Sequence, residues 1–375
     1  MGRWLSNAFR LGLKEFASLV SDKVLFAFII YSFSLNIYSE ATGIRTDVNN
    51  ARVAVVDSDR SALSARIRDG LLEPYFSRPD LIDRSEIDRV MDNGLYAFVL
   101  DIPPDFEADV LDRHVPKLQL NIDATAMTQA GVGGSYIESV VQQETRNYLR
   151  SRGVEAQLPV VAVTRAFFNP NLEGIWFQAV LSVLESLAIL TILLVGAAVI
   201  RERERGTIEH LLVMPIRASE IAAAKIWANG LVILVAATLA LIFVVQYVLE
   251  VPIKGSIALF VGGTAVYLFA LASLGILLAT IANTMPQFTL LAIPVFLILN
   301  MLSGAVSPLE SMPEPIQFAI QVSPAVHFVN FAQSVLYRAA GLEIVWPHIT
   351  LLLALGVVFL ITALARFRMM LARAQ

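Results

Sequence analysis

The chain has 375 residues, of which 56% are hydrophobic and 16% charged, with a net charge of -4 and a mean hydropathy of +0.66. Soluble domains carry about a quarter charged residues, so this composition indicates an integral membrane protein. No basic tract is present, which argues against nucleic acid as a partner. The absence of Cys excludes disulfides and thiolate chemistry, and four dispersed His residues predict no metal site.

The first 23 residues predict an amphipathic helix. Five apolar residues fall on one side at helical spacing: Leu5, Phe9, Leu13, Phe16 and Val20. Arg10 and Lys14 fall on another side, so the segment 1–23 is expected to lie in the inner membrane interface. The mixed charges before the first apolar run, and the lack of a small-residue cleavage site after it, favour an uncleaved anchor over a signal peptide.

Six long runs with few charges predict six transmembrane helices, because about 20 residues are needed to cross the hydrocarbon core. The expected spans are residues 24–42, 175–200, 226–249, 256–282, 286–306 and 345–365. The short connecting segments carry twelve Lys and Arg on the side of the N-terminus, but only Lys254 and Arg338 on the other. The positive-inside rule therefore predicts that both termini, including the tail 366–375, are cytoplasmic.

Residues 43–174 form a polar insertion of domain size, with 20 acidic and 14 basic residues. They are expected in the periplasm. Strands are predicted at Arg52–Asp57, Tyr96–Ile102, Lys117–Asp123 and Val160–Ala166. Helices are predicted between them, at Ser61–Glu73, 85–94, 103–111 and Ser135–Arg150, with Ser61 as an N-cap. This alternation predicts an α/β domain with a largely parallel sheet.

Acidic residues follow two predicted strands of this domain: Asp57, Asp59 and Asp123. Acids at strand ends can belong to α/β active sites, but more often they cap the next turn or helix. The insertion shows no Ser-His-Asp set, no Gly-rich phosphate loop and no metal-ligand spacing. We therefore favour a binding or assembly domain over a catalytic one.

The link between the second and third expected spans, residues 201–225, is longer than the roughly 2–8 residues that a turn requires. Gly206 and Thr207 suit the end of one helix and the start of another. Three apolar residues then share a face at i, i+3, i+4 spacing: Ile208, Leu211 and Leu212. Glu209 and His210 fall opposite, and Pro215 ends the helix.

Arg201 to Arg205 are expected to form i,i+3 and i,i+4 ion pairs with Glu204, with Glu209 and with the termini of these helices. Ser219 is expected to cap the following helix. Two roles for this link stay open from the residues alone. It is either a surface helix that anchors the loop, or a docking helix that receives force from a cytoplasmic partner.

Three polar residues in the expected spans are candidates for a substrate path: Glu185, Gln246 and Asn300. An acid in a span is costly, so Glu185 either contacts substrate or bonds to a neighbouring helix. Gln246 and Asn300 also suit interhelical contacts. His327 and His348 are expected to be interfacial residues without a special role.

Several stretches resemble the bacterial ABC-2 type transporter permeases that carry a large periplasmic domain between their first two spans. They are VAVVDSDRS (Val53–Ser61), Y-x-F-V-x-x-I-P-P-D-F-E (Tyr96–Glu107), FNPN (Phe168–Asn171), RERERGTIEHLLVMPI (Arg201–Ile216), LSGAVSPLESMPEPI (Leu302–Ile316) and SPAVHFVNFAQSVLYRAAG (Ser323–Gly341). The most specific piece is E-x-G-T-x-E followed by Met-Pro. The resemblance implies an α-helical polytopic membrane protein with six transmembrane helices and an inserted α/β periplasmic domain.

The same resemblance implies that the link is a coupling helix seated on a separate ABC ATP-binding subunit. The matching residues are Arg201, Glu202, Glu204, Gly206, Thr207, Glu209, His210, Leu211, Leu212, Met214 and Pro215. The chain contains no G-x-x-x-x-G-K-[ST] phosphate loop, so ATP and Mg²⁺ are expected on the partner and no cofactor on this chain. A half-transporter of this type implies a second permease copy or a homologous permease, and a periplasmic membrane-fusion adaptor.

Residues 307–341 resemble the extracellular re-entrant region that precedes the last span. Non-helical backbone at membrane depth is tolerated only where it is buried or wetted. The candidate extracellular gate comprises Ser303, Gly304, Pro308, Pro313 and Pro324.

Two functions from different classes follow. The first is the permease subunit of an ATP-driven exporter in the bacterial inner membrane, which moves a hydrophobic or amphipathic substrate outward. The alternative is a membrane-anchored periplasmic binding or assembly scaffold without transport activity. The structured link 201–225 favours the first, because a scaffold has no need of a docking helix.

Overall fold

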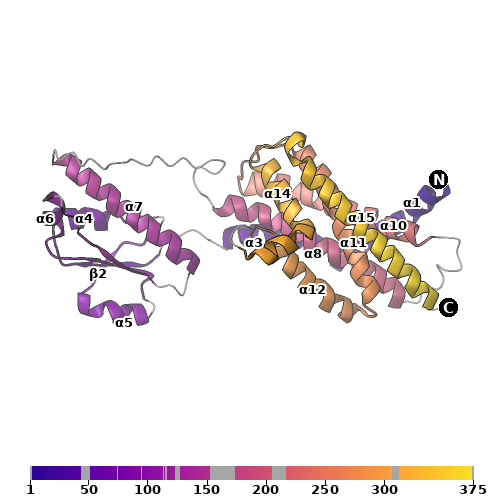
Figure 1. The fold of residues 1–375 in the computed structure, drawn as a ribbon, viewed down its shortest axis with the longest axis horizontal. Helices are drawn as coiled ribbons and strands as arrows, with labels where there is room; N and C mark the ends of the chain where they lie inside the picture. The colour runs from indigo at the N-terminus through magenta and orange to yellow at the C-terminus, as the bar shows by residue number, and fades with distance from the viewer. Residues whose placement is uncertain are drawn as a thin grey trace. The chain divides into compact units, whose positions relative to one another are not determined.

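The computed structural model describes residues 2–43, 51–73, 75–93, 95–112, 114, 116–122, 127–152, 174–204, 217–305 and 312–373. The chain divides into two compact units (Figure 1). The helical unit comprises residues 1–43 and 175–375, and the α/β unit comprises residues 44–174. Each unit has a hydrophobic core of its own.

The helical unit is built from helices that match the apolar runs of the sequence. Their bounds are α1 Gly2–Ser21, α2 Lys23–Ser32, α3 Leu35–Gly43, α8 Gly174–Glu204, α10 Ala218–Leu239 with its π-helical continuation Ala240–Val248, α11 Ile257–Ile281, α12 Met285–Met301, α13 Glu314–Ala319, a 3₁₀ turn Ile320–Val322, α14 Pro324–Leu336 and α15 Leu342–Arg373.

Five helical stretches in the described part of the chain are long and apolar enough to cross a membrane: 23–43, 174–204, 218–248, 257–281 and 342–367. Helix α12 has 17 residues and is shorter than the span expected at 286–306. Residues 306–311 lie outside the described part, so the sixth span stays a prediction.

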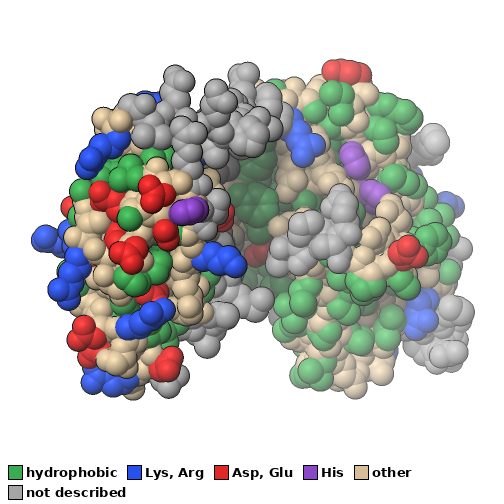
Figure 2. Space-filling view, turned by 60° about the vertical axis from the view of Figure 1, so that its left-hand side comes forward, with side chains coloured by type: hydrophobic (Ala, Val, Ile, Leu, Met, Phe, Trp, Pro, Cys, Tyr) green, Lys and Arg blue, Asp and Glu red, His purple; other side chains and the backbone are tan. Residues whose placement is uncertain are grey.

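Helix α8 lies at the centre of the helical unit. In the most apolar 18-residue stretch of α8, 83% of the residues are buried. The corresponding fraction is 28% in α10 with its continuation and 17% in α15. A helix that is hydrophobic all round suits such a position. The outer helices instead expose apolar side chains, among them Phe243 and Ile361. Figure 2 shows mainly hydrophobic side chains on the visible face of this unit, and many charged ones on the α/β unit.

The α/β unit contains one four-stranded sheet in the order β2-β1-β3-β4. The strands are β1 Val53–Asp57, β2 Asp80–Leu81, β3 Phe98–Ile102 and β4 Gln119–Ile122. Strand β1 pairs in parallel with β2 and β3, whereas β3 and β4 are antiparallel. Two of the three pairings are parallel, as predicted, and β4 forms an antiparallel edge that makes the sheet mixed.

The edge strand β4 follows β3 through the connection 103–118, which contains helix α6, Phe106–Leu111. This connection is as long as the connection 82–97 between β2 and β3, which run in the same direction. Its length therefore does not decide that β4 runs antiparallel to β3. The expected strand at Val160–Ala166 lies outside the described residues.

Helices cover both faces of the sheet (Figure 1). Helices α4, Ala62–Asp69, and α7, Met127–Ser151, pack with Val53, Val55 and Leu100 in one core. Helix α5, Ile87–Asp92, packs through Val90 against the opposite face. The alternation of side chains along each strand produces these two cores.

The acidic residues at the strand ends cap local structure, as the sequence suggested. Asp57 accepts hydrogen bonds from the Arg60 amide at 2.7 Å and the Ser64 hydroxyl at 2.9 Å. Asp59 accepts one from the Glu107 amide at 3.1 Å. Ser61 is the N-cap of α4, also as predicted. Asp123 lies outside the described residues.

Glu107 joins α4, α6 and α7 through one carboxylate. It accepts hydrogen bonds from the Tyr148 hydroxyl at 2.5 Å and from the Leu63 amide at 3.1 Å. The Tyr148 hydrogen bond, more than the backbone donor or nearby Arg152, holds the pKa of Glu107 below its ordinary value.

We predict that this carboxylate makes the α/β unit sensitive to acid. Because the folded-state pKa of Glu107 is lowered, its contribution is complete above the unfolded-state pKa of about 4.3. It is lost as the pH falls through the lower folded-state pKa. Tyr148→Phe should lower the free energy of unfolding of this unit by about 1.5–3 kcal/mol at neutral pH and weaken its pH dependence.

The measurement is hydrogen exchange of the β3 and α7 amides in the intact chain. It reports the free energy of unfolding of the α/β unit at each pH, once the exchange times are scaled for the intrinsic rate. Tyr75→Phe, which changes a more exposed tyrosine of the same unit, is the control. Equal behaviour of the two variants would contradict the role of Glu107.

The helical unit packs closely at some glycines but not at others. A Cβ built at Gly275 of α11 would lie 2.9 Å from the carbonyl oxygen of Ile192 in α8. One at Gly263 would lie 2.1 Å from the ring of Phe331, which is fully buried in α14. One at the adjacent Gly262 would meet nothing within 4 Å. The neighbouring glycines therefore differ in role.

We predict that Gly263→Ala lowers the free energy of unfolding by about 1–3 kcal/mol, because the new methyl group must displace the Phe331 ring. Gly262→Ala should be neutral or stabilise the helix by up to about 1 kcal/mol. Thermal unfolding of the two variants in the same detergent compares them directly. Similar melting temperatures for both would show that α14 does not pack on α11 as described.

Candidate functional site

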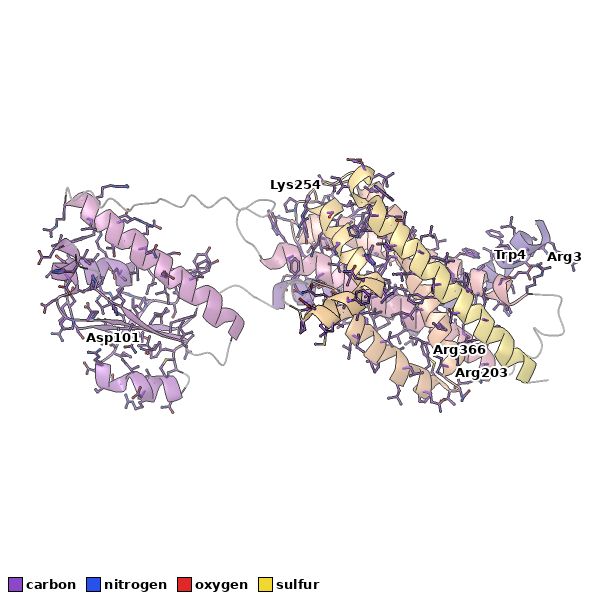
Figure 3. All side chains as sticks on the ribbon, viewed as in Figure 1. Arg3, Trp4, Asp101, Arg203, Lys254 and Arg366 are labelled. Atoms are coloured by element: carbon purple, nitrogen blue, oxygen red, sulfur yellow. The ribbon has the colours of Figure 1, made fainter. Side chains whose placement is uncertain are left out.

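Basic side chains gather at one end of the helical unit. Arg3, Arg203 and Arg366 lie at this end, and Lys254 lies at the other (Figure 3). We call the first the basic end. Helix α1, the last turn of α8 and the first turns of α10 and α12 all reach it (Figure 1).

A buried lysine lies at the centre of the basic end. Lys225 of α10 is 1% exposed, and its Nζ is 3.0 Å from Glu15 Oε1 of α1 and 3.0 Å from Glu202 Oε1 of α8. It also donates to the Ala198 carbonyl at 3.2 Å. We call Lys225, Glu15 and Glu202 the Lys225 cluster. A buried ammonium requires such partners, so the cluster fixes three helices together.

Helix α1 is attached to α10 along its length. Trp4 Nε1 donates to Ser219 Oγ at 3.1 Å, and Trp227 Nε1 donates to the Ala8 carbonyl at 3.1 Å. Gly12 leaves room for the Trp227 ring, because a Cβ there would lie 2.1 Å from it. The amphipathic leader is thus an integral part of the helical unit.

The side of α1 next to this contact is apolar and exposed, although Phe9 also stacks on the Trp227 ring. Leu5, Phe9 and Leu13 are 61%, 57% and 48% exposed. These are three of the residues that the sequence pattern assigns to one side of the helix. A helix with this division suits the membrane interface.

Four consecutive residues at the end of α8 contact four different parts of the helical unit. The pairs are Arg201 with Asp22 at 4.0 Å, Glu202 with Lys225 at 3.0 Å, Arg203 with the Ala282 carbonyl and the Asn283 side chain at 2.7 Å each, and Glu204 with the Met285 amide at 2.8 Å. The end of α8 is therefore joined to the link between α1 and α2, to α10, to the end of α11 and to the start of α12.

These contacts correct one expectation. The alternating Arg and Glu residues were expected to pair with one another along the helix. Where the structure describes them, Arg201 to Glu204 contact other elements instead, and of their charged partners, Asp22 and Lys225, it is Lys225 that is buried. Ser219 does not cap α10, since it accepts from Trp4 and Arg217 is the N-cap residue.

The middle of the predicted coupling segment lies outside the described residues. This holds for Gly206, Thr207, Glu209, His210, Leu211, Leu212, Met214 and Pro215. Arg201, Glu202 and Glu204 are described at its start. At its end, the Arg217 amide donates to Glu220 Oε2 at 2.8 Å.

Sequence reasoning missed the role of Lys225 and Glu15. A lysine in the first turns of a long apolar helix, and an acid on the polar side of the amphipathic leader, were the available signals. Neither signal states which residue is the partner of the other, because 210 positions separate them in the chain.

Two of the three candidate path residues meet in the structure. Glu185 of α8 and Asn300 of α12 line the same small cavity of about 20 Å³, together with Ser303 and Tyr267. A cavity of this size holds about one water molecule. Gln246 is half-buried in the π-helical segment and does not line this cavity.

The candidate gate residues fall between α12 and α14. Ser303 is buried, and Gly304 has a φ of 83°, a conformation that favours glycine. Pro313 precedes α13, and Pro324 begins α14, where a proline is well tolerated. Pro308 lies outside the described residues.

We predict that Lys225→Met lowers the free energy of unfolding by about 3–5 kcal/mol, because Glu15 and Glu202 then remain without their cation. Adding Glu202→Gln to this variant should restore part of the loss. Lys254→Met, at an exposed lysine, should change stability by less than about 0.5 kcal/mol. The stability of the three variants is compared by heating each one in the same detergent and measuring the fraction that stays monodisperse. Wild-type stability of Lys225→Met would exclude the Lys225 cluster as a structural anchor.

Known proteins are similar to this chain over nearly its whole length. A model of the ABC-2 family transporter proteins matches residues 24–365. The inner membrane transport permease YhhJ of Escherichia coli is 47% identical over 98% of both chains. The probable multidrug ABC transporter permease YbhR of the same organism is 26% identical over 95% of this chain and 96% of its own. ABC transporter G family member 20 of Dictyostelium discoideum is 22% identical over 90% of this chain and 47% of its own.

The family match covers residues 24–365 and therefore includes the α/β unit and most of the helical unit. The protein belongs to the ABC-2 family of transporters and is a permease, the membrane subunit that lacks the ATPase domain.

Proposed function

We propose that this permease exports a hydrophobic or amphipathic substrate across the bacterial inner membrane and is driven by a separate ATP-binding subunit. The observation that carries the proposal is the arrangement of Arg201–Glu204, whose side chains join the end of α8 to four other parts of the helical unit. The relatives are named a transport permease and a probable multidrug permease, which agrees with a role in transport.

Residues 201–225 are the coupling segment in this proposal. Movement of the segment by an ATP-binding subunit would displace α8 and, through the Lys225 cluster, also α1 and α10. Arg203 and Glu204 would pass the same movement to the start of α12. Buried ion pairs and packed helices suit this task, because they shift as rigid bodies rather than deform.

The basic end faces the cytoplasm in this proposal, and residues 43–174 lie in the periplasm. The excess of Lys and Arg at the basic end supports this orientation. Six spans, with α12 as the fifth, return the C-terminus to the cytoplasm. A second permease copy or a homologous permease completes the path, and the α/β unit is suited to a membrane-fusion adaptor.

The substrate path follows α8 in this proposal. Glu185 and Asn300 offer polar groups within an otherwise apolar environment, and Gln246 is a further candidate. The cavity between Glu185 and Asn300 is too small for a drug-sized molecule, which needs about 300 Å³ or more. Export therefore requires α8 and α12 to separate, and Ser303, Gly304, Pro308, Pro313 and Pro324 to open as the outer gate.

Purification of the tagged chain from its host in mild detergent, followed by mass spectrometry, tests the partner. We expect a stoichiometric ATP-binding subunit that is lost when residues 201–215 are replaced by a flexible linker. If only periplasmic proteins accompany the chain, the scaffold function replaces the export function.

We predict that Glu209→Lys uncouples ATP hydrolysis from export, since it reverses charge in the middle of the coupling segment. Substrate-stimulated ATPase activity of the reconstituted complex should fall at least about tenfold, the loss that removal of about 1.4 kcal/mol of coupling produces. Glu73→Lys makes the same charge change on an exposed residue of the α/β unit and should leave the activity unchanged. Full stimulation in Glu209→Lys would exclude the coupling role.

A further inference from the structure

Two histidines from different helices meet near the start of α15, at the end of the helical unit opposite the basic end. The imidazole rings of His327 in α14 and His348 in α15 have centroids 6.0 Å apart and an interplanar angle of 39°. His327 is 5% exposed. His327 therefore differs from the expected interfacial residue in that it is buried within the protein.

One hydrogen bond defines the protonation of His327. Its Nε2 lies 2.8 Å from the Gln321 carbonyl oxygen, which can only accept, so Nε2 carries the proton. In the neutral ring Nδ1 then has a lone pair. A hydrogen bond from one ring nitrogen to a backbone carbonyl is how proteins orient a histidine whose other nitrogen binds a metal ion.

Two polar atoms in the same region are buried without a partner among the described residues. They are Nδ1 of His348 and Oγ of Ser323. Ser323 is the residue before α14 and lies one helical turn before His327. A buried polar atom without a partner costs about 1–3 kcal/mol, so such an atom in a native protein points to a missing water or ion.

We propose that His327 and His348 together bind one divalent first-row transition-metal ion, with Zn²⁺ as the representative case. Imidazole nitrogens suit these ions. Zn–N bonds of about 2.0–2.1 Å and a tetrahedral angle place the centroids of two rings that share an ion roughly 5.2 Å apart. The observed separation is 6.0 Å, so the rings must approach each other by about 0.8 Å when the ion binds.

The proposed site has two protein nitrogens and open positions for water. The described residues contain no group of three or more His, Asp or Glu side chains that could hold a metal ion. The Ser323 hydroxyl, which is buried without a partner, is suited to bind a water ligand of the ion. The open positions distinguish it from a structural Zn²⁺ site, in which four protein ligands surround the ion.

Binding would tie α14 to α15. His327 lies three residues after Pro324, at the start of α14, and His348 lies in the second turn of α15. An ion between them fixes the two helices where the proposed outer gate begins. The inference goes beyond the proposed export function, and its test does not depend on transport.

The test uses the full-length permease purified without a polyhistidine tag and treated with a chelator. Zn²⁺ binding is measured by calorimetry, and the melting temperature is measured with and without Zn²⁺. We expect about one saturable Zn²⁺ per chain and a higher melting temperature with Zn²⁺. Mg²⁺, which prefers oxygen ligands, should have neither effect.

The variants separate a shared ion from independent binding. His327→Gln and His348→Gln should each raise the dissociation constant for Zn²⁺ at least about tenfold. The double variant should lose little more than either single variant, because both ligands serve one ion. His114→Gln, at the exposed histidine of the α/β unit, should bind as the wild type does.

The opposite results would overturn the proposal. They are the absence of saturable Zn²⁺ binding, or wild-type affinity in His348→Gln. His348 is only partly buried, so its replacement should leave the fold intact even if the buried His327 does not tolerate substitution. The melting temperature without Zn²⁺ checks that each variant is folded.

Discussion

A buried positive charge organises the basic end of this permease. An ammonium group inside a packed helical unit is tolerated only with oppositely charged partners, so the position of Lys225 dictates those of Glu15 and Glu202. Those acids belong to α1 and α8, and the requirement therefore fixes an interfacial helix, a central helix and an outer helix in one arrangement. The stacking of Phe9 on Trp227 adds apolar contact beside the cluster.

The end of α8 is unusual because its four charged residues, Arg201–Glu204, all contact other parts of the helical unit. Four charged residues in succession would be an ordinary exposed helix end if they met only water. Here each one reaches a different part of the unit, and two of them, Arg203 and Glu204, satisfy backbone groups at the turn between α11 and α12. Such contacts turn a helix end into a junction, which suits a part that receives movement from another subunit.

The two ends of the helical unit differ in their chemistry. The basic end is held by ion pairs, whereas the opposite end is held by close packing at Gly263 and by aromatic contacts among Phe260, Tyr267 and Phe328. Between them, Glu185 and Asn300 line one small cavity. The polar groups at the centre of the unit thus lie between an end held by ion pairs and an end held by apolar packing.

Local patterns in the sequence determined the elements. Apolar runs of about 20 residues defined the long helices, the capping residue Ser61 defined the start of α4, and the polar insertion 43–174 defined a second unit, because each signal lies within a few residues of its effect. The tertiary structure decided which residues are partners: Lys225 with Glu15, Arg203 with the Ala282 carbonyl, and His327 with His348. It also decided that β4 runs antiparallel to β3. These contacts depend on distances between segments that are far apart in the chain, and hydrophobic periodicity carries no information about them.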